Sequence, residues 1–214
     1  MGAASTRPML LWAGVSSFVL GLLCFAIDRR AVHFFHDRIN RRWFRRIRLT
    51  TDYAKGAYWL SIAIGTLALT WLARGLTSDT ALLGAIFNGA LAFLVCLAIA
   101  SAILHSIKLV FGRRRPRDEL EHELYGFRFL HYDWQHDSFP SGHAMTIFCV
   151  AVILSGALPA LAPLWFAIAV YLSFTRALIN SHFLSDVFIG AAIGILASRE
   201  TLLFLFHNLS QPWF

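Results

Sequence analysis

Residues 81–116 read ALLGAIFNGALAFLVCLAIASAILHSIKLVFGRRRP, and Lys108 is the one charged side chain before Gly112. A helix needs about 20 predominantly apolar residues to cross the hydrocarbon core of a bilayer. Residues 81–111 exceed that length. We therefore predict a membrane-spanning helix here, long enough to tilt or to project past the bilayer.

The rest of the chain repeats this pattern. Five further apolar stretches predict helices at about 9–27, 57–73, 144–158, 163–179 and 183–197, the last of which residues 201–206 could extend. The 214 residues are 57% hydrophobic and 14% charged, which is typical of a membrane protein rather than a soluble domain. We predict an all-α fold, a single domain over residues 1–214 with six transmembrane helices in one bundle. The first stretch has no small-residue cleavage site at its end, so we expect it to be retained as a span.

The loops differ in length and polarity. Residues 28–55 and 112–143 form long polar connections, whereas residues 75–80 and 159–163 form short ones. Because consecutive spans alternate in direction, the two long loops and the turn near Asn180 should share one side of the membrane. Both termini should lie on the other side. We expect the active site at the interface that carries the long loops.

The net charge of +7 comes from basic residues clustered in these loops. That distribution favours a membrane surface or an anionic lipid headgroup as the partner, and argues against nucleic acid. Residues 38–48, RINRRWFRRIR, predict an amphipathic interfacial helix, or equally a charge cluster that sets topology. The cysteines Cys24, Cys96 and Cys149 lie in apolar runs and are expected to be packing residues.

Three clusters on the polar side carry the candidate chemistry. The first, KLVFGRRRP, ends the long apolar stretch at Pro116. Its Lys108 and Arg115 are seven residues apart and would share a helical face if the helix continued past Gly112. Taken alone, they could be ordinary positive residues at a helix end, as we interpret Arg113, Arg114 and Arg117.

The second cluster, PSGH, begins at Pro140 and directly precedes an apolar stretch. Ser141 can cap the helix, and the free backbone N–H groups of a helix start bind phosphate well. Gly142 would let the backbone approach an anion closely. A plain helix cap is the alternative, although an apolar helix gains nothing from His143 in its first turn.

The third cluster, RALINSHFLSD, runs from Arg176 to Asp186. His182 and Asp186 are four residues apart and would face each other on one helix. A carboxylate bonded to one ring nitrogen fixes the tautomer and leaves the other nitrogen free to attack. The alternative is an ion pair on a helix surface, but ionisable residues close to a membrane span are functional candidates.

Together the patterns K-x6-RP, PSGH and R-x5-H-x3-D resemble, in content and order, the three-part signature of the type-2 phosphatidic acid phosphatase superfamily. The motifs extend from Lys108 to Asp186, and the six-helix pattern extends the resemblance over nearly the whole chain. One departure is Thr175, where the family usually has serine before the arginine of the third motif. Threonine keeps the hydroxyl, so we expect little consequence.

The resemblance implies a mechanism without metal or cofactor. His182 would attack phosphorus, and Asp186 would orient it and stabilise the positive imidazolium. His143 would protonate the leaving oxygen and then activate water. The phosphate oxygens would be held by Lys108, Arg115, Ser141, Gly142 and Arg176.

The resemblance also implies a lipid phosphate as substrate: phosphatidylglycerophosphate, phosphatidic acid, a lipid A phosphate or undecaprenyl pyrophosphate. A phosphotransferase using the same histidine is an alternative, and a non-enzymatic transporter or scaffold is a weaker one. We expect a bacterial inner membrane, with the active site on the extracytoplasmic side. The loop charges alone would place the site in the cytoplasm by the positive-inside rule. The segment HYDWQHDS, with His131, Asp133, His136 and Asp137, could hold a metal, but a loop over the headgroup pocket is the favoured interpretation.

Overall fold

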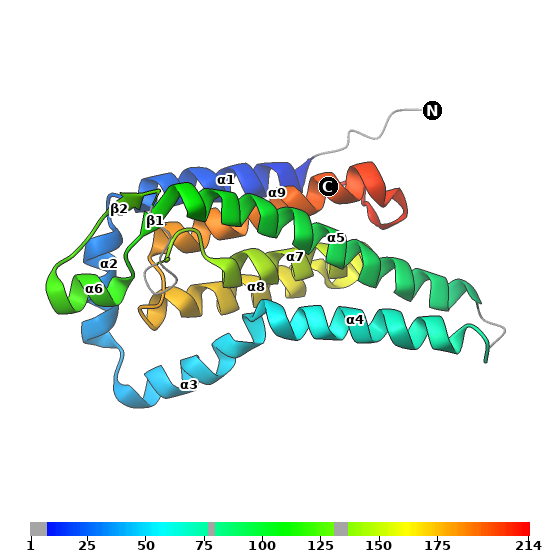
Figure 1. The fold of residues 1–214 in the computed structure, drawn as a ribbon, viewed down its shortest axis with the longest axis horizontal. Coiled ribbons are helices and arrows are strands. Elements are labelled where there is room, and N and C mark those ends of the chain that lie inside the picture. Colours follow the sequence, from blue (N-terminus) through cyan, green and yellow to red (C-terminus); the bar gives the residue numbers. More distant parts are fainter. Residues whose placement is uncertain (1–7, 77–79, 131–136) are drawn as a thin grey trace.

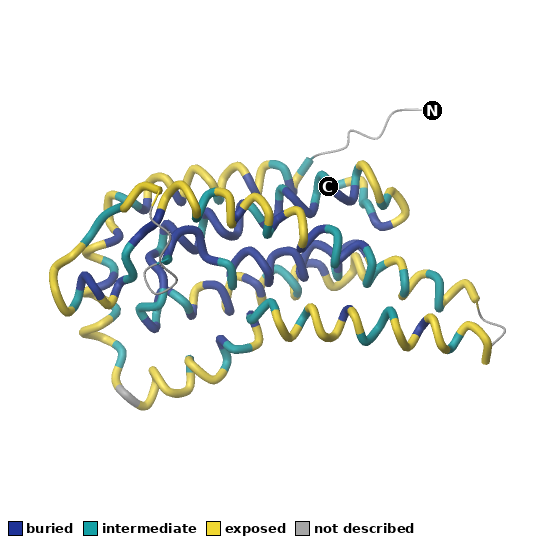
Figure 2. Tube along the Cα trace, in the orientation of Figure 1, coloured by how far each residue is buried: buried dark blue, intermediate teal, exposed yellow. Residues whose placement is uncertain are grey.

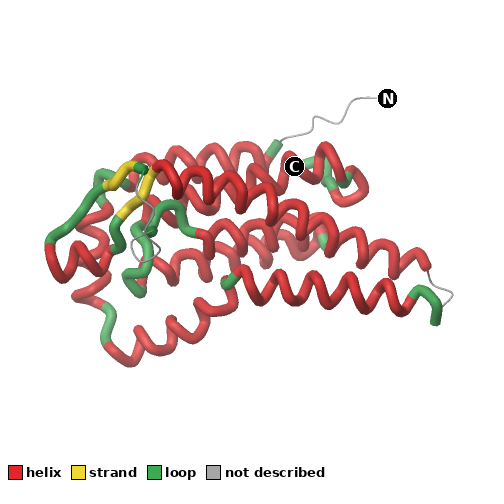
Figure 3. The backbone as a smooth tube through the Cα atoms, viewed as in Figure 1, coloured by secondary structure: helices red, strands yellow, loops and turns green. Residues whose placement is uncertain are grey.

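The structure, a computed structural model, describes residues 8–76, 80–130 and 137–214. Long helices run side by side along one axis, and a group of short elements covers one end of the bundle (Figure 1, Figure 3). The long helices are α1 (Met9–Cys24), α4 (Gly56–Ala73), α5 (Thr80–Val110), α7 (Gly142–Ala157), α8 (Ala162–Leu178) and α9 (Leu184–Leu205). The short elements are α2 (Asp28–Arg38), α3 (Arg41–Thr51), α6 (Pro116–His122), β1 (Phe111–Arg113) and β2 (Phe127–Phe129).

Each of the six predicted apolar stretches contains one long helix, but not all of them qualify as spans. Four helical stretches of the described chain are long and apolar enough to cross a membrane: Arg42–Ala73, Thr80–Val110, Pro159–Leu178 and Leu184–Leu205. Helices α1 and α2 qualify only as a pair, which is bent by 85°. Helix α7 has 16 residues, or roughly 24 Å at 1.5 Å per residue, against a hydrocarbon core of about 30 Å. The protein is therefore an all-α integral membrane protein with four to five candidate spans.

Helices α7 and α9 form the centre of the bundle (Figure 2). Most of α7 is buried, from Ala144 to Gly156 with few exceptions. Two glycines of α9 allow the close approach, because a Cβ on Gly190 or Gly194 would collide with a backbone carbonyl of Ser141 or Met145. This contact fixes the start of α7 against the start of α9, where the second and third sequence clusters meet.

The first cluster does not continue helix α5. Such a continuation was required for Lys108 and Arg115 to share a helical face. Helix α5 ends at Val110, and β1 pairs antiparallel with β2, with Gly112 opposite Arg128. Lys108 and Arg115 therefore do not share a helical face. Pro116 also keeps Arg115 out of a helix, because a proline disfavours helical backbone in the residue before it. Arg115 is accordingly extended, with φ −83° and ψ 158°, and Pro116 begins α6.

The long loop predicted at 28–55 is largely helical. A helix lies where one was predicted at 38–48, shifted by three residues: α3 spans Arg41–Thr51. The Asn40 side chain caps it by accepting from Arg42 N and Trp43 N. The start of α1 meets the carboxyl-terminal residues at the opposite end of the bundle, where Met9 N donates to Trp213 O at 2.9 Å (Figure 1). All three cysteines are buried and unbridged, as expected for packing residues.

Candidate functional site

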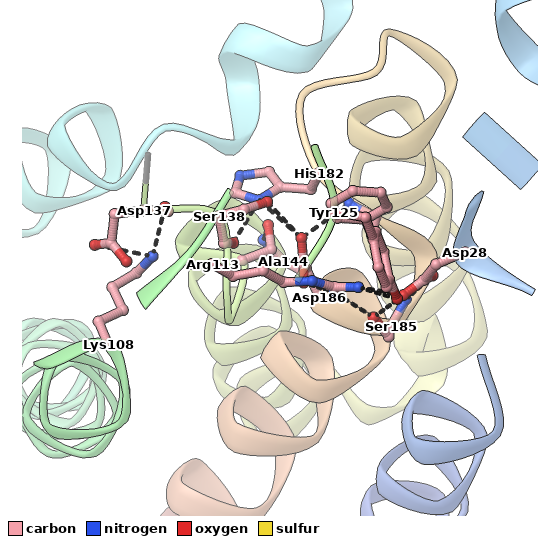
Figure 4. Close-up of polar contacts among 12 residues, drawn as sticks. Asp28, Lys108, Arg113, Tyr125, Asp137, Ser138, Ala144, His182, Ser185 and Asp186 are labelled. Atoms are coloured by element: carbon pink, nitrogen blue, oxygen red, sulfur yellow. Dashed lines mark hydrogen bonds and ion pairs between the residues drawn. The ribbon is translucent and has the colours of Figure 1, made fainter. Parts of the chain in front are cut away.

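The second and third clusters come together where α7 and α9 begin (Figure 4). Ser141 is the N-cap of α7, as predicted, and its Oγ accepts from Ala144 N at 3.4 Å. Its backbone N–H donates to the Asp186 carbonyl at 3.0 Å, which joins the two clusters directly. Gly142 is the first helical residue, and a Cβ added there would meet no heavy atom of the described residues within 4 Å. The start of α7 therefore has an open side next to free backbone N–H groups.

The two predicted catalytic histidines face each other. The ring centroids of His143 and His182 are 6.5 Å apart, at an interplanar angle of 53°. His182 is 5% exposed, in the turn that precedes α9. The Nε2 atom of His143 is buried and has no hydrogen-bond partner among the described residues. A phosphoryl group could therefore be contacted by both rings.

The surroundings of His182 set its tautomer. Its Nδ1 lies 2.8 Å from the Ser138 carbonyl oxygen, which can only accept, so Nδ1 carries the proton and Nε2 keeps its lone pair. Burial lowers the pKa of His182 to about 4, against the opposing effect of Asp186. The ring is thus a neutral nucleophile at neutral pH.

Asp186 lies beside this ring but does not bond it directly. Its Oδ2 is 3.8 Å from His182 Nδ1, whereas it accepts from Ser138 Oγ at 2.5 Å and from Phe183 N at 2.9 Å. We expected the pair to share one helix, but α9 begins at Leu184, after His182. The four-residue helical spacing therefore does not apply, and Ser138 lies between the two side chains in the hydrogen-bond network.

The predicted cations surround the same space. Lys108 Nζ donates to the Asp137 carbonyl at 3.0 Å and lies 3.4 Å from its carboxylate. Arg176 Nη1 donates to Thr51 Oγ1 at 3.4 Å. The Nε atoms of Arg115 and Arg176 are buried without a hydrogen-bond partner among the described residues. Buried donors are rarely left unsatisfied in folded proteins, so these atoms indicate room for an anion.

The sequence analysis did not predict three residues of the hydrogen-bond network around His182 and Asp186. Arg113 was interpreted as an ordinary positive residue, yet it is 1% exposed and forms ion pairs with Asp28 and Asp186 (Figure 4). Ser138 and Asp28 were treated as loop residues, and both are fully buried. One available signal was the position of Asp28, a lone acid directly after an apolar run.

Two further predictions concern the surroundings. Thr175, which replaces the family's serine, is buried, and its hydroxyl donates to Leu172 O at 2.6 Å and lies within hydrogen-bond distance of Thr51 Oγ1, at 2.9 Å. The retained hydroxyl is therefore used. His131, Asp133 and His136 lie outside the described residues, so the proposed headgroup loop stays a prediction there.

Known proteins resemble this chain in sequence and in fold. Lipid A 1-phosphatases of Rhizobium etli and Rhizobium johnstonii are each 29% identical to it, over 104 and 111 residues. These alignments cover 48% and 51% of this chain and 45% and 46% of the relatives, so the chain spans about half the length of the curated relatives it matches.

Two crystal structures have the same fold. Aquifex aeolicus LpxE superposes with a TM-score of 0.59 at 18% identity, over 83% of this chain and 96% of its own. The transmembrane PAP2-type phosphatidylglycerolphosphate phosphatase of Bacillus subtilis gives 0.57 at 22% identity, over 90% and 96%.

The family comparison covers the site itself. The sequence profile of the PAP2 superfamily matches residues 89–210, which is more than half of the chain. All three clusters, from Lys108 to Asp186, fall inside that range. The protein therefore belongs to the PAP2 superfamily.

Proposed function

We propose that this protein is a lipid phosphatase that hydrolyses a phosphomonoester or pyrophosphate of a membrane lipid through a phosphohistidine. The observation that carries the proposal is the buried, neutral His182, whose ring centroid lies 6.5 Å from that of His143. Nearby, the Nε atoms of Arg115 and Arg176 have no hydrogen-bond partner in the part of the chain that the structure describes. The names of the two Rhizobium relatives make lipid A 1-phosphate the first substrate to test.

In the first step, Nε2 of His182 attacks phosphorus, and the bond from phosphorus to the lipid oxygen breaks. The Nδ1 proton stays on the ring and is held by the Ser138 carbonyl, so the phosphorylated ring becomes an imidazolium. His143 gives its proton to the leaving oxygen. A phosphate dianion entering beside His143 favours the protonated ring that this transfer requires.

In the second step, water attacks the phosphohistidine. His143, now neutral, accepts a proton from the water, and the phosphorus–nitrogen bond breaks to release inorganic phosphate and neutral His182. The Nε2 atom of His143, which no described residue bonds, would make both transfers. The two steps together restore every group to its starting state.

The transition state needs positive charge around the phosphoryl oxygens rather than covalent chemistry from the protein. Lys108, Arg115 and Arg176 supply three cations, and the first turn of α7, which begins at Gly142, supplies free backbone N–H groups. With these donors, we propose that the reaction proceeds without a metal ion.

We further propose that six spans embed the single domain in a bacterial inner membrane, with α7 counted as the short central span. The site would lie at the extracytoplasmic interface. Arg113, Arg115 and Arg176 are enclosed in the site region, so they should not be counted as topological signals for the cytoplasm. Fusions after Phe214 test the side, because the carboxyl terminus lies at the end opposite the site (Figure 1). A fluorescent fusion with inactive alkaline phosphatase supports the proposal, and the reverse pattern overturns it.

The activity test uses purified protein in detergent with EDTA present. Phosphate release is measured from lipid A, phosphatidylglycerophosphate, phosphatidic acid and undecaprenyl pyrophosphate, with His182→Ala as the control. We expect release by the wild type and none by the variant, together with a phosphorylated His182 peptide after acid-free quenching. Release by both proteins would contradict histidine catalysis. A trapped phosphohistidine without phosphate release would instead indicate transfer to another lipid.

A further inference from the structure

A buried charge network lies directly behind the proposed nucleophile (Figure 4). Arg113 Nη1 donates to Asp186 Oδ1 at 2.5 Å and to Ser185 Oγ at 2.7 Å. Its Nη2 donates to Asp28 Oδ2 at 2.8 Å and to Tyr125 OH at 2.8 Å. One guanidinium therefore bridges two carboxylates that are distant in sequence.

Aromatic rings hold this guanidinium in place. The Arg113 Cζ atom lies 4.1 Å from the ring centroid of Phe183, and three more rings lie within 5.2 Å: Phe25, Tyr125 and Phe127. A planar guanidinium can stack on aromatic faces and at the same time donate hydrogen bonds from two separate nitrogens, which a lysine ammonium cannot do. The site thus selects arginine for its shape as well as its charge.

The other end of the network is anchored at the corner between α1 and α2. Asp28 is the first residue of α2 and is fully buried. It accepts from Ser185 N at 3.1 Å and Ser185 Oγ at 2.5 Å, in addition to Arg113. Burial raises the pKa of the Asp28 carboxyl group, and its three donors oppose that rise. The same bonds tie the α1–α2 corner to the first turn of α9.

The network continues to the nucleophile through Ser138. Asp186 Oδ2 accepts from Ser138 Oγ, and the Ser138 carbonyl accepts from His182 Nδ1. The Ser138 N–H in turn donates to the Arg113 carbonyl at 3.0 Å. Asp186 and Ser138 together orient His182, and Arg113 contacts both of them. Its side chain bonds Asp186, and its backbone carbonyl bonds Ser138.

We propose that Arg113 and Asp28 are positioning residues for the reaction at His182. With both carboxylates ionised, two carboxylates and one guanidinium give this network a net charge of −1. Phosphorylation turns the His182 ring into an imidazolium with one positive charge, while the negative phosphoryl oxygens are held by Lys108, Arg115 and Arg176. The network therefore balances the charge of the ring in the intermediate rather than in the resting enzyme, which is the pattern expected of preorganised electrostatic stabilisation. Neither residue touches substrate, and the inference rests on the proposed phosphatase activity.

The test is a set of steady-state measurements on the full chain in detergent, with the lipid that the wild type hydrolyses fastest. We expect Arg113→Gln to lower kcat by about 100-fold while KM changes by less than about threefold, because the network acts in the transition state. Asp28→Asn keeps the shape of the side chain and should lower kcat about tenfold. Arg113→Lys should recover part of the loss of Arg113→Gln, because it keeps the charge without the fork.

Matched controls come from exposed residues of the same segments, Arg117→Gln and Asp37→Asn, which should keep wild-type kcat. The double variant of Arg113→Gln and Asp28→Asn should be no slower than Arg113→Gln alone, because residues that act as one unit do not add. If the substitutions acted only by destabilising the protein, the two losses of kcat would multiply. The unfolding temperature would then also fall with each substitution.

Three outcomes overturn the inference. The first is an Arg113→Gln kcat within about threefold of the Arg117→Gln control. The second is a double variant whose loss equals the product of the single losses. The third applies if Arg113→Gln does not fold: Asp28→Asn then decides, and wild-type kcat in that variant refutes the positioning role. A wild type that releases no phosphate from any lipid overturns the proposed function first, and the inference with it.

Discussion

Helices α9 and α4 are both apolar enough to cross a membrane, yet they differ in what surrounds them. In the most apolar window of α9, 61% of the residues are buried within the protein, against 11% in the span Arg42–Ala73 that includes α4 (Figure 2). Helix α9 packs on α1, α5 and α7, whereas α4 buries only Ala63 and Thr70. A helix that positions the site and a helix that faces lipid are therefore both apolar. The two helices differ in how many of their residues pack against the rest of the protein.

A pair of glycine substitutions should separate the two helices most strongly. Gly190→Ala on α9 would press a Cβ against the Ser141 carbonyl, whereas Gly65→Ala on α4 would meet nothing within 4 Å. We expect Gly190→Ala to lower the unfolding temperature by several degrees and kcat by about 100-fold, because it displaces the start of α7. Gly65→Ala should leave both unchanged or raise stability slightly.

Thermal unfolding in detergent and phosphate release check this prediction. If the two glycine variants behaved alike, α9 would have more freedom to shift than its packing indicates. The comparison between a site-positioning helix and a lipid-facing helix would then fail.

A pair of serine substitutions should have the next largest effect. Ser138→Ala removes the hydroxyl that donates to Asp186, and Ser61→Ala removes an exposed α4 hydroxyl that donates to Ala57 O at 2.9 Å. A hydrogen bond to a charged group contributes about 1.5–3 kcal/mol, so Ser138→Ala should lower kcat about tenfold or more. Ser61→Ala should retain wild-type kcat. Equal kcat values for the two variants would show that Asp186 needs no support from Ser138.

The pH dependence of stability should also differ between the buried site and the exposed surface. The pKa of His182 is about 4 in the folded protein, against roughly 6.5 for an unperturbed histidine. Between these values the unfolded chain binds more protons, so folding stability falls as the pH is lowered from about 6.5 to about 4. The His182→Gln variant lacks this contribution, and its unfolding temperature should therefore fall less steeply over that window.

His36→Gln is the matched control, because His36 is exposed on α2. It should follow the wild-type slope. The measurement is the unfolding temperature in detergent at several pH values across the window. Parallel slopes for wild type and His182→Gln would show that His182 is not held neutral by burial.

Much of the fold could be predicted because the hydropathy of a segment indicates that it forms a helix in apolar surroundings. The long stretch at 81–111 matches α5 at Thr80–Val110 almost residue for residue. Hydropathy could not show that α7 is short and enclosed, since a buried helix and a lipid-facing helix are equally apolar. It also could not locate the β1–β2 pair, whose register depends on contacts between residues far apart in sequence.

The site divides in the same way. That His143, His182, Ser141 and Gly142 lie close together could be predicted, because each motif places its own groups within one turn of a helix start. Arg113 could not, because its role depends on Asp28, 85 residues away in sequence. In sequence it was one of several arginines before Pro116, and only the fold shows that Arg113 is buried whereas Arg114 and Arg115 are half-buried.

The smallest expected effect concerns α3, which lies with α4 in the weakly buried span Arg42–Ala73. Trp43 is 57% exposed and Leu49 is 70% exposed, and Arg46 stacks over the Trp43 ring at 5.6 Å. A basic helix with exposed apolar side chains is suited to an anionic bilayer surface, where each arginine contributes about 1 kcal/mol or less. We predict that replacing Arg42, Arg45 and Arg46 together by glutamine raises KM about threefold in vesicles of phosphatidylcholine mixed with phosphatidylglycerol, with kcat unchanged.

Two conditions distinguish lipid binding from topology. The KM increase should disappear in phosphatidylcholine alone and at high salt, because screening removes attraction to the anionic surface. If these arginines only set topology, KM would be unchanged in every vesicle, and the fusion after Phe214 would report a partly inverted protein. The same three substitutions therefore separate the two interpretations of residues 38–48, and they do so far from the α7–α9 contact on which the chemistry depends.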